Sequence, residues 1–215
     1  MEILTSLPLI LRECNKLNLI DSSFSINGCI HVGAHEGQEY PIYKYFGINN
    51  LIFYEPLSKN FENLKSKVDA SVILRQVALG DVVGEIEMYL EPRGLSSSIL
   101  EPEYHLEQYP QIKFNDKETV KITKLDNESF DRSKFNFLNV DVQGYELEVF
   151  KGAIKTLCYI DMIICEINRK NMYKNCPLVE EIDEFLSPFG FKRAFTYWQL
   201  DGGTWGDGLY LKVKQ

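Results

Sequence analysis

The sequence predicts one α/β domain built on a mostly parallel sheet, with helices on both faces and an antiparallel pair of strands at its C-terminal end. Short apolar runs alternate with segments of helical spacing, a pattern typical of parallel sheets. The last two apolar runs have no helix between them, so they should pair antiparallel. The 215 residues contain no repeat or linker and suffice for one such domain, so residues 1–215 are interpreted as a single unit.

Residues 1–79 supply three of the expected strands. A leading helix is expected within residues 1–25, because apolar side chains recur at helical spacing from Leu4 to Leu19. In chain order we then expect a strand at Gly28–Gly33, a helix at Gly37–Phe46, a strand at Asn50–Tyr54, a helix at Ser58–Val68 and a strand at Ser71–Leu79.

The rest of the chain continues the pattern on both sides of a polar interruption. Residues 92–116 are rich in Ser, Pro and Tyr, and we expect them to form an acceptor-side insertion, a lid or a wall. The other expected elements are strands at Glu85–Leu90, Val120–Leu125, Phe135–Val140 and Tyr159–Ile167, helices at Tyr145–Leu157 and Leu178–Leu186, and the final strands Phe191–Tyr197 and Asp207–Val213.

Charge and cysteine content restrict the class of protein. The formal net charge is -8, and an acidic surface repels phosphate backbones, so we expect no nucleic-acid partner. The apolar runs are too short for membrane insertion, and Met1–Ile10 has no basic region typical of a signal peptide. The five cysteines are scattered, which favours a reducing, cytoplasmic location.

The segment from His31 to Gly37 has the composition of a ligand-binding turn. An apolar run ends at Gly33, which permits a tight turn and close approach of a ligand, and a helix is expected from Gly37. Glu55 ends the second expected strand, where a carboxylate can accept hydrogen bonds from both hydroxyls of a nucleotide ribose. Together they indicate an adenosine ligand, either a dinucleotide or S-adenosylmethionine. A tight turn without a ligand and an acid at a helix start are the structural alternatives.

Other polar residues also fall at expected strand ends, which meet at one edge of a parallel sheet. Asp141 ends the Phe135–Val140 strand, where it can hold an ammonium group, bind a metal or accept a proton. We expect Glu146 and Glu148 to lie in the first turn of the following helix. Ser97 lies in the polar insertion, where its hydroxyl can bind a cofactor or a sugar, and we expect His105 of the same segment to face solvent.

Several of these segments together resemble the FkbM-type S-adenosylmethionine-dependent methyltransferases. The resemblance runs from about Asn27 to the C-terminus, and its most specific part is Asp141–Ala153, which resembles the pattern D-x-E-G-x-E-x-x-x-L-x-G-A. Gln143 stands where that pattern usually has Glu. The other matching segments are His31–Gly37, Glu55-Pro56, Val77–Asp81 and Leu125-Asp126.

The resemblance implies a Rossmann-like class I methyltransferase sheet and O-methylation, often of sugars or polyketide-type hydroxyls. It places Glu55 at the ribose of S-adenosylmethionine and Asp141 at the methyl-transfer site. The expected cofactor-binding residues are His31, Gly33, Ala34, His35, Glu55, Pro56, Val77, Ala78, Ser97 and Asp141.

The expected chemistry is methyl transfer to a hydroxyl of a small-molecule or glycan acceptor, most simply a sugar. Asp141, Glu166 and His35 are the candidate catalytic residues, because removal of the hydroxyl proton needs a base. Asp141, Glu166 and Asn168 are also a candidate oxygen set for Mg²⁺ or Mn²⁺. Direct binding of cofactor or acceptor by these side chains, without a metal, is the alternative.

Two other functions use the same residues. An NAD(P)-dependent oxidoreductase would share the turn and the ribose acid, but the sequence lacks a Tyr-x-x-x-Lys pair after the fourth strand and the full dinucleotide glycine set. A non-catalytic nucleoside-binding scaffold would bind the cofactor without transferring its methyl group. Binding of S-adenosylmethionine followed by methyl transfer distinguishes the three.

Overall fold

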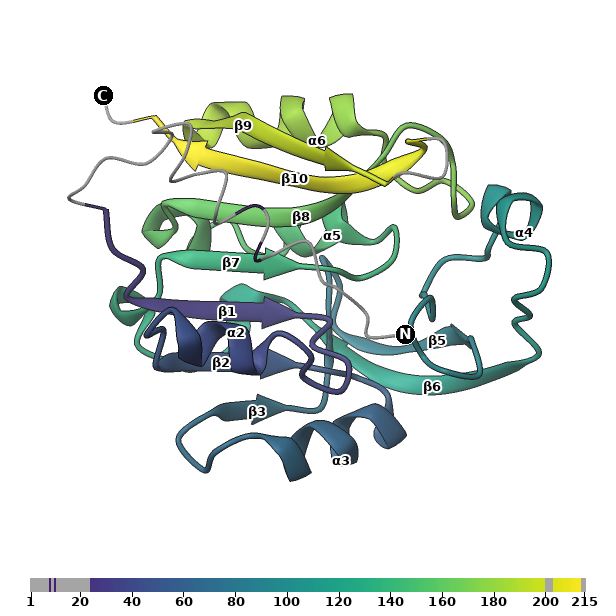
Figure 1. The fold of residues 1–215 in the computed structure, drawn as a ribbon, viewed down its shortest axis with the longest axis horizontal. Coiled ribbons are helices and arrows are strands. Elements are labelled where there is room, and N and C mark those ends of the chain that lie inside the picture. The colour runs from purple at the N-terminus through teal and green to yellow at the C-terminus, as the bar shows by residue number, and fades with distance from the viewer. Residues whose placement is uncertain (1–7, 9, 11–23, 200–202, 214–215) are drawn as a thin grey trace.

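A seven-stranded sheet forms the centre of the molecule in the computed structural model, which describes residues 8, 10, 24–199 and 203–213. Its strands are β1 (Gly28–Val32), β2 (Asn50–Tyr54), β3 (Ile73–Arg75), β7 (Phe137–Val140), β8 (Met162–Asn168), β9 (Phe191–Trp198) and β10 (Trp205–Lys212). They lie in the order β3-β2-β1-β7-β8-β10-β9 (Figure 1). The first five of these are parallel, and β10 is antiparallel to both β8 and β9. The predicted sheet and C-terminal hairpin are confirmed.

Helices cover both faces of this sheet. They are α2 (Tyr40–Tyr45) and α3 (Ser58–Lys67) on one face and α5 (Glu146–Lys151) and α6 (Val179–Leu186) on the other (Figure 1). Alternate residues of β1 enter two separate cores: Cys29 packs in the cluster of Tyr43 and Leu64, and Ile30 in the cluster of Phe150. Burial of both faces explains why the strands appear as continuous apolar runs.

A smaller sheet and a short helix lie beyond the carboxyl ends of the parallel strands (Figure 1). The sheet has the order β4-β6-β5, with strands β4 (Ala78–Leu79), β6 (Asp116–Thr123) and β5 (Gly84–Leu90), and the helix is α4 (Tyr104–Gln108). The prediction of one strand at Ser71–Leu79 is wrong, because β3 pairs with β2 and β4 pairs with β6. The apolar pattern does not reveal that the chain changes sheets at Gln76 and Val77.

Two predicted helices are shorter than expected. The segment before α2 forms turns, in which Gly37 N–H donates to the Ala34 carbonyl, and the helix begins beside Pro41, which suits a first helical turn. The helix α5 ends at Lys151, and a separate 3₁₀ turn follows at Thr156–Tyr159. The leading helix expected within residues 1–25 lies outside the described residues apart from Pro8 and Ile10, which are helical.

Candidate active site

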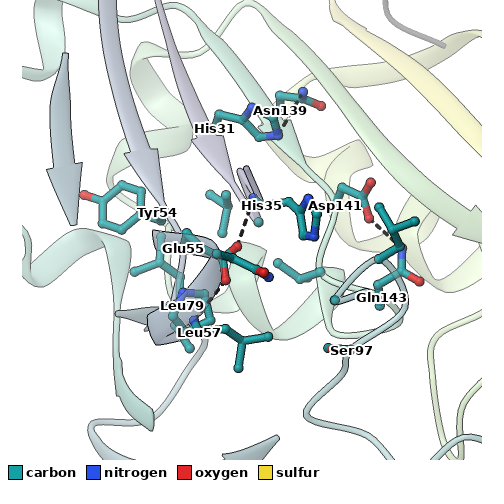
Figure 2. Close-up of a pocket in the computed structure, with 18 of the residues that line it drawn as sticks. His31, His35, Tyr54, Glu55, Leu57, Leu79, Ser97, Asn139, Asp141 and Gln143 are labelled. Atoms are coloured by element: carbon teal, nitrogen blue, oxygen red, sulfur yellow. Dashed lines mark hydrogen bonds between the residues drawn. The ribbon is translucent and has the colours of Figure 1, made fainter. Parts of the chain in front are cut away.

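A cavity runs along the carboxyl ends of β2, β1 and β7 and is closed on one side by the small sheet and the insertion. Nine of the ten predicted cofactor-binding residues line it: His31, Gly33, His35, Glu55, Pro56, Val77, Ala78, Ser97 and Asp141. The tenth, Ala34, is fully buried, and its N–H donates to the Tyr54 carbonyl at 3.0 Å. In Figure 2, Glu55 and Leu79 lie on one side of the cavity and Asp141 and Gln143 on the other, with His35 between them.

The turn after β1 brings the two sides of the cavity together. Gly33 has φ +82°, and a Cβ atom placed there would lie 1.8 Å from the carbonyl oxygen of Asp141. Only a glycine therefore lets the β1 turn pack directly against the end of β7. This contact fixes the position of the Asp141 backbone relative to the turn.

Glu55 is held by main-chain groups on both oxygens. Its Oε2 accepts from the His35 N–H and its Oε1 from the Leu57 N–H, each at 2.9 Å (Figure 2). The residue is 4% exposed, and this burial raises its pKa to about 7. The Asn60 side chain also hydrogen-bonds Glu55. A carboxylate has about four lone-pair sites, so at least one remains for a donor from a ligand.

The wall beside Glu55 is apolar. It is formed by side chains of β4, β5 and the loops after β2 and β3, namely Leu57, Val77, Ala78, Leu79 and Met88. Such a surface suits a flat aromatic base, while the neighbouring carboxylate suits hydroxyl groups. The two features together have the chemistry of an adenosine site.

Asp141 is the carboxylate on the opposite side of the cavity. It is accessible from the cavity but lies deep between strand ends, and this partial removal from water raises its pKa. Its Oδ1 accepts from the Gln143 amide at 2.7 Å (Figure 2). The other predicted catalytic carboxylate, Glu166, is 5% exposed and also accepts from Gln143, at 2.8 Å. Glu166 therefore lies behind Gln143, whereas Asp141 faces the cavity.

The two histidines of the turn have engaged ring nitrogens. His35 Nε2–H donates to the Arg93 carbonyl at 3.0 Å, which leaves Nδ1 to accept from Gln38 at 2.6 Å. His31 is buried, and this burial lowers its pKa to about 3, so the ring is neutral. Its nitrogens contact the Tyr43 hydroxyl and the Asn139 amide. Both rings are thus fixed parts of the wall.

The predicted metal ligands do not form one oxygen set. Asn168 is 1% exposed, does not line the cavity, and its side-chain atoms have no hydrogen-bond partner in the described part of the chain. Among the described residues no three His, Cys, Asp or Glu side chains are arranged to hold a metal ion. The amide of Gln143 instead occupies the space between Asp141 and Glu166.

The insertion has a cavity-lining part and a buried part. Its first residues, Gly94, Leu95, Ser97 and Ile99, line the cavity, and a Cβ on Gly94 would lie 2.9 Å from His35 Nε2. The prediction of a solvent-facing His105 is wrong. His105 is 4% exposed and packs on Tyr109, Phe114 and Tyr173, because α4 docks on residues 171–174.

Sequence reasoning missed several residues of the site. Glu146 lies in the first turn of α5, as predicted, but its contacts were not foreseen: it is 1% exposed and its Oε1 accepts from the Val142 and Gly144 N–H groups at 3.1 Å. Glu39 also lines the cavity, and burial raises its pKa to about 7. Glu39 follows the Gly33–Gly37 turn by two residues, and that position could have marked it as a site residue. It was overlooked because a helix was expected from Gly37 onward.

Comparison with known proteins connects this geometry to a family. The family model described as "Methyltransferase FkbM domain" matches residues 31–193. The 2-O-methyltransferase NoeI of Sinorhizobium fredii (strain NBRC 101917 / NGR234) is 26% identical over 150 residues, which cover 66% of this chain. The chain spans 60% of the length of that relative.

Solved structures share the fold at low sequence identity. A Listeria monocytogenes protein assigned to the S-adenosylmethionine-dependent methyltransferases has a TM-score of 0.55 and 8% identity, with 95% of this chain and 100% of that chain covered. The magnesium protoporphyrin IX methyltransferase ChlM of Synechocystis PCC 6803, with bound cofactor, has a TM-score of 0.54 and 9% identity, with coverages of 99% and 82%. None of the helices in the described ranges has the length and apolar character needed to cross a membrane.

Proposed function

The chain belongs to the FkbM methyltransferase family, and on that premise we propose that it transfers the methyl group of S-adenosylmethionine to a hydroxyl of a sugar or glycan. The observation that carries the proposal is one cavity with a main-chain-anchored carboxylate, Glu55, on one side and a second carboxylate, Asp141, on the other. The similarity to a 2-O-methyltransferase supports an oxygen acceptor.

The cavity residues fit the cofactor's chemistry. The apolar wall of Leu57, Val77 and Leu79 would hold the adenine, and Glu55 would accept hydrogen bonds from the ribose hydroxyls. Asp141, at the other side, would face the positively charged methionyl part, with Gly33 beneath it. A carboxylate in this low-dielectric position attracts a cation more strongly than it would in water.

The bound cofactor supplies an electrophilic methyl group on its sulfonium. The chain must then orient the acceptor hydroxyl, exclude water and take up the hydroxyl proton. Asp141 is best placed to accept that proton, because its carboxylate faces the cavity and its raised pKa makes it a stronger base than an exposed Asp. Glu166 lies behind Gln143, and both nitrogens of His35 are engaged.

The cavity is also lined by groups that suit a sugar. Trp205 lines it together with polar side chains, and its Nε1–H donates to the Tyr109 hydroxyl of the insertion at 2.9 Å. An indole face packs against the C–H face of a sugar ring, and the polar neighbours satisfy its hydroxyls. These polar neighbours are Gln38, Glu39, Gln199 and Asp207.

A labelled-methyl assay tests the proposal. The chain is incubated with methyl-labelled S-adenosylmethionine and a panel of free sugars, nucleotide sugars and oligosaccharides, and the products are analysed for a methyl ether. We expect label in a sugar hydroxyl of at least one acceptor, and none with the Glu55→Ala variant at low cofactor concentration. Cofactor binding without transfer to any hydroxyl contradicts the proposal and favours the non-catalytic scaffold.

A further inference from the structure

The side chain of Gln143 contacts three polar groups from three parts of the chain. Its Nε2 donates to Asp141 Oδ1 at 2.7 Å and to Glu166 Oε2 at 2.8 Å, and its Oε1 accepts from the Tyr173 hydroxyl at 2.8 Å. An amide nitrogen carries two N–H groups, so both are used on carboxylates. The glutamine side chain is therefore fully bonded at the boundary between the cavity and Glu166.

The backbone of Gln143 is fixed as firmly as its side chain. It has φ +57°, a conformation that few residues other than glycine adopt, and its carbonyl accepts from Ser98 Oγ at 2.6 Å. The neighbouring N–H groups of Val142 and Gly144 both donate to Glu146 Oε1. This network fixes the main chain from which the side chain of Gln143 reaches Asp141 and Glu166.

Gln143 supplies the hydrogen-bond donors that two crowded carboxylates need. Two carboxylates that share one site repel each other, and a donor placed between them relieves the repulsion while keeping both oxygens in place. A hydrogen bond to an ionised group also fixes its direction, which matters for a base that must meet a substrate proton.

We propose that Gln143 is a positioning residue whose amide holds Asp141 in one orientation toward the cavity and keeps Glu166 beneath it. We name the three residues Asp141, Gln143 and Glu166 the carboxylate clamp. The proposal rests on the proposed function only in what Asp141 does there; the clamp itself is a property of this chain. The insertion contributes to it, because Ser98 and the Ser96 carbonyl contact Gln143 and Tyr173.

The pKa shifts of the two carboxylates also support a role for Gln143. Burial raises the pKa of both Asp141 and Glu166, and the hydrogen bonds from Gln143 act in the opposite direction on each. The other titratable groups of the described residues that act on the pair are His35, Glu39, Glu146, Cys165, Tyr173, Cys176 and Asp207. These groups are unchanged in a variant of residue 143, so a difference between the two proteins reports on the clamp.

The decisive experiment is a pH titration of carboxyl carbons by ¹³C NMR in the chain labelled at Asp and Glu, with Asp141→Asn and Glu166→Gln to assign the signals. In Gln143→Met, which keeps the length of the side chain and loses both donors, we expect the Asp141 midpoint to rise by about one pH unit or more. The single-turnover rate of methyl transfer should fall about tenfold, because the base is no longer held in one orientation. In the matched control Gln111→Met, at an exposed glutamine, neither quantity should change.

A second variant guards against a folding defect. Tyr173→Phe keeps both Gln143 donors and removes only the hydroxyl that orients the amide, so the Asp141 midpoint should rise by a smaller amount. Thermal unfolding checks that each variant is folded. An unchanged Asp141 midpoint in folded Gln143→Met overturns the clamp. A wild-type chain that binds no S-adenosylhomocysteine overturns the proposed function instead, and the NMR titration still decides on the clamp.

Discussion

Glu55 and Asp141 end the two strands that flank β1, yet the protein holds them in different ways. Glu55 accepts two main-chain N–H groups, which any residue at positions 35 and 57, other than proline, would supply. Asp141 accepts a side-chain amide, which is itself oriented by Tyr173. Glu55 is therefore held mainly by main-chain groups, whereas Asp141 is held by the side chain of Gln143 and, through it, by that of Tyr173.

The different ways in which Glu55 and Asp141 are held suit them to different roles, cofactor binding and proton transfer. A carboxylate fixed by the backbone makes a durable binding contact that tolerates substitution around it. A carboxylate fixed by side chains has a protonation state and a direction that each neighbour can tune. We therefore expect variants on the Glu55 side to act on cofactor affinity, and variants on the Asp141 side to act on turnover.

The largest expected effect is that of Asp141→Asn on turnover. Asparagine keeps the shape and can still accept from Gln143, but it cannot take up the hydroxyl proton. Loss of a general base should lower the rate of methyl transfer about a hundredfold or more. Single-turnover assays with the labelled cofactor measure this rate, and calorimetry with S-adenosylhomocysteine measures affinity. Parallel loss of affinity and rate would instead assign Asp141 to the cofactor's ammonium group.

The Glu55→Ala variant should weaken cofactor binding and leave the rate at saturating cofactor unchanged. Each hydrogen bond to a buried charged group contributes about 1.5–3 kcal/mol, so loss of the ribose contacts should weaken S-adenosylhomocysteine binding about tenfold or more. At saturating cofactor the rate should recover. Glu87→Ala is the matched control, because Glu87 is an exposed glutamate that pairs with Lys117 and does not line the cavity. An unchanged dissociation constant would remove Glu55 from the ribose site.

The Glu55 side was largely predictable from the sequence. The strand Asn50–Tyr54 is recognised from its apolar run, and Glu55 from its place directly after that run. Both signals lie in neighbouring residues. The Gly33 turn is local in the same sense. For this reason the mostly parallel sheet and its hairpin follow from spacing, and nine of the ten residues expected to bind a cofactor line one cavity.

The Asp141 side was less predictable, because its contacts join residues far apart in the chain. Gln143 lies 23 positions from Glu166 and 30 from Tyr173, and no pattern in the sequence connects them. Glu146 looks like an ordinary acid at a helix start until the loop before it is seen to fold back on its carboxylate. The break between β3 and β4 could not be predicted for the same reason. It is seen only in the strand pairing, because β3 pairs with β2 and β4 pairs with β6.

A pH dependence should distinguish the two sides further. Burial gives Glu55 a folded-state pKa of about 7 against an ordinary value of 4.5, so the folded chain binds its proton more tightly than the unfolded chain does. Its stabilising contribution is complete below about pH 4.5 and is lost as the pH rises toward 7. Ribose hydroxyls bind the ionised form, so cofactor affinity should change in the opposite direction.

Calorimetry at a series of pH values measures this second effect. Below pH 7 the affinity for S-adenosylhomocysteine should fall by up to about tenfold per pH unit, and binding near neutrality should release a proton into the buffer. Glu39 and Glu146 also titrate near pH 7 and contribute to the wild-type slope. The Glu55→Ala variant retains them, so its slope should be flatter. Equal slopes in both proteins would contradict the assignment to Glu55.

The smallest expected effect is that of metal chelation on methyl transfer. This experiment tests whether Asp141 and Glu166 act as metal ligands. A hard cation binds carboxylate and carbonyl oxygens, whereas the Gln143 amide directs its N–H groups at Asp141 and Glu166 and so presents positive charge where the cation would lie. We expect exhaustive chelation, with or without added Mg²⁺ or Mn²⁺, to leave wild-type methyl transfer unchanged. A loss that Mg²⁺ restores would return Asp141 and Glu166 to the role of metal ligands.

The variant Gln143→Glu makes that null result informative. It exchanges the two donors for oxygens and brings three carboxylates within hydrogen-bond distance, a set that either takes up protons or attracts a cation. Mn²⁺ binding, measured by electron paramagnetic resonance, should therefore appear in Gln143→Glu and not in the wild-type chain or in Gln143→Met. Equal Mn²⁺ binding by all three proteins would show that the amide does not control the charge at this end of the cavity. Mn²⁺ binding by Gln143→Glu alone would show that replacing the amide NH₂ of residue 143 by an oxygen converts this end of β7 from a base site into a metal site.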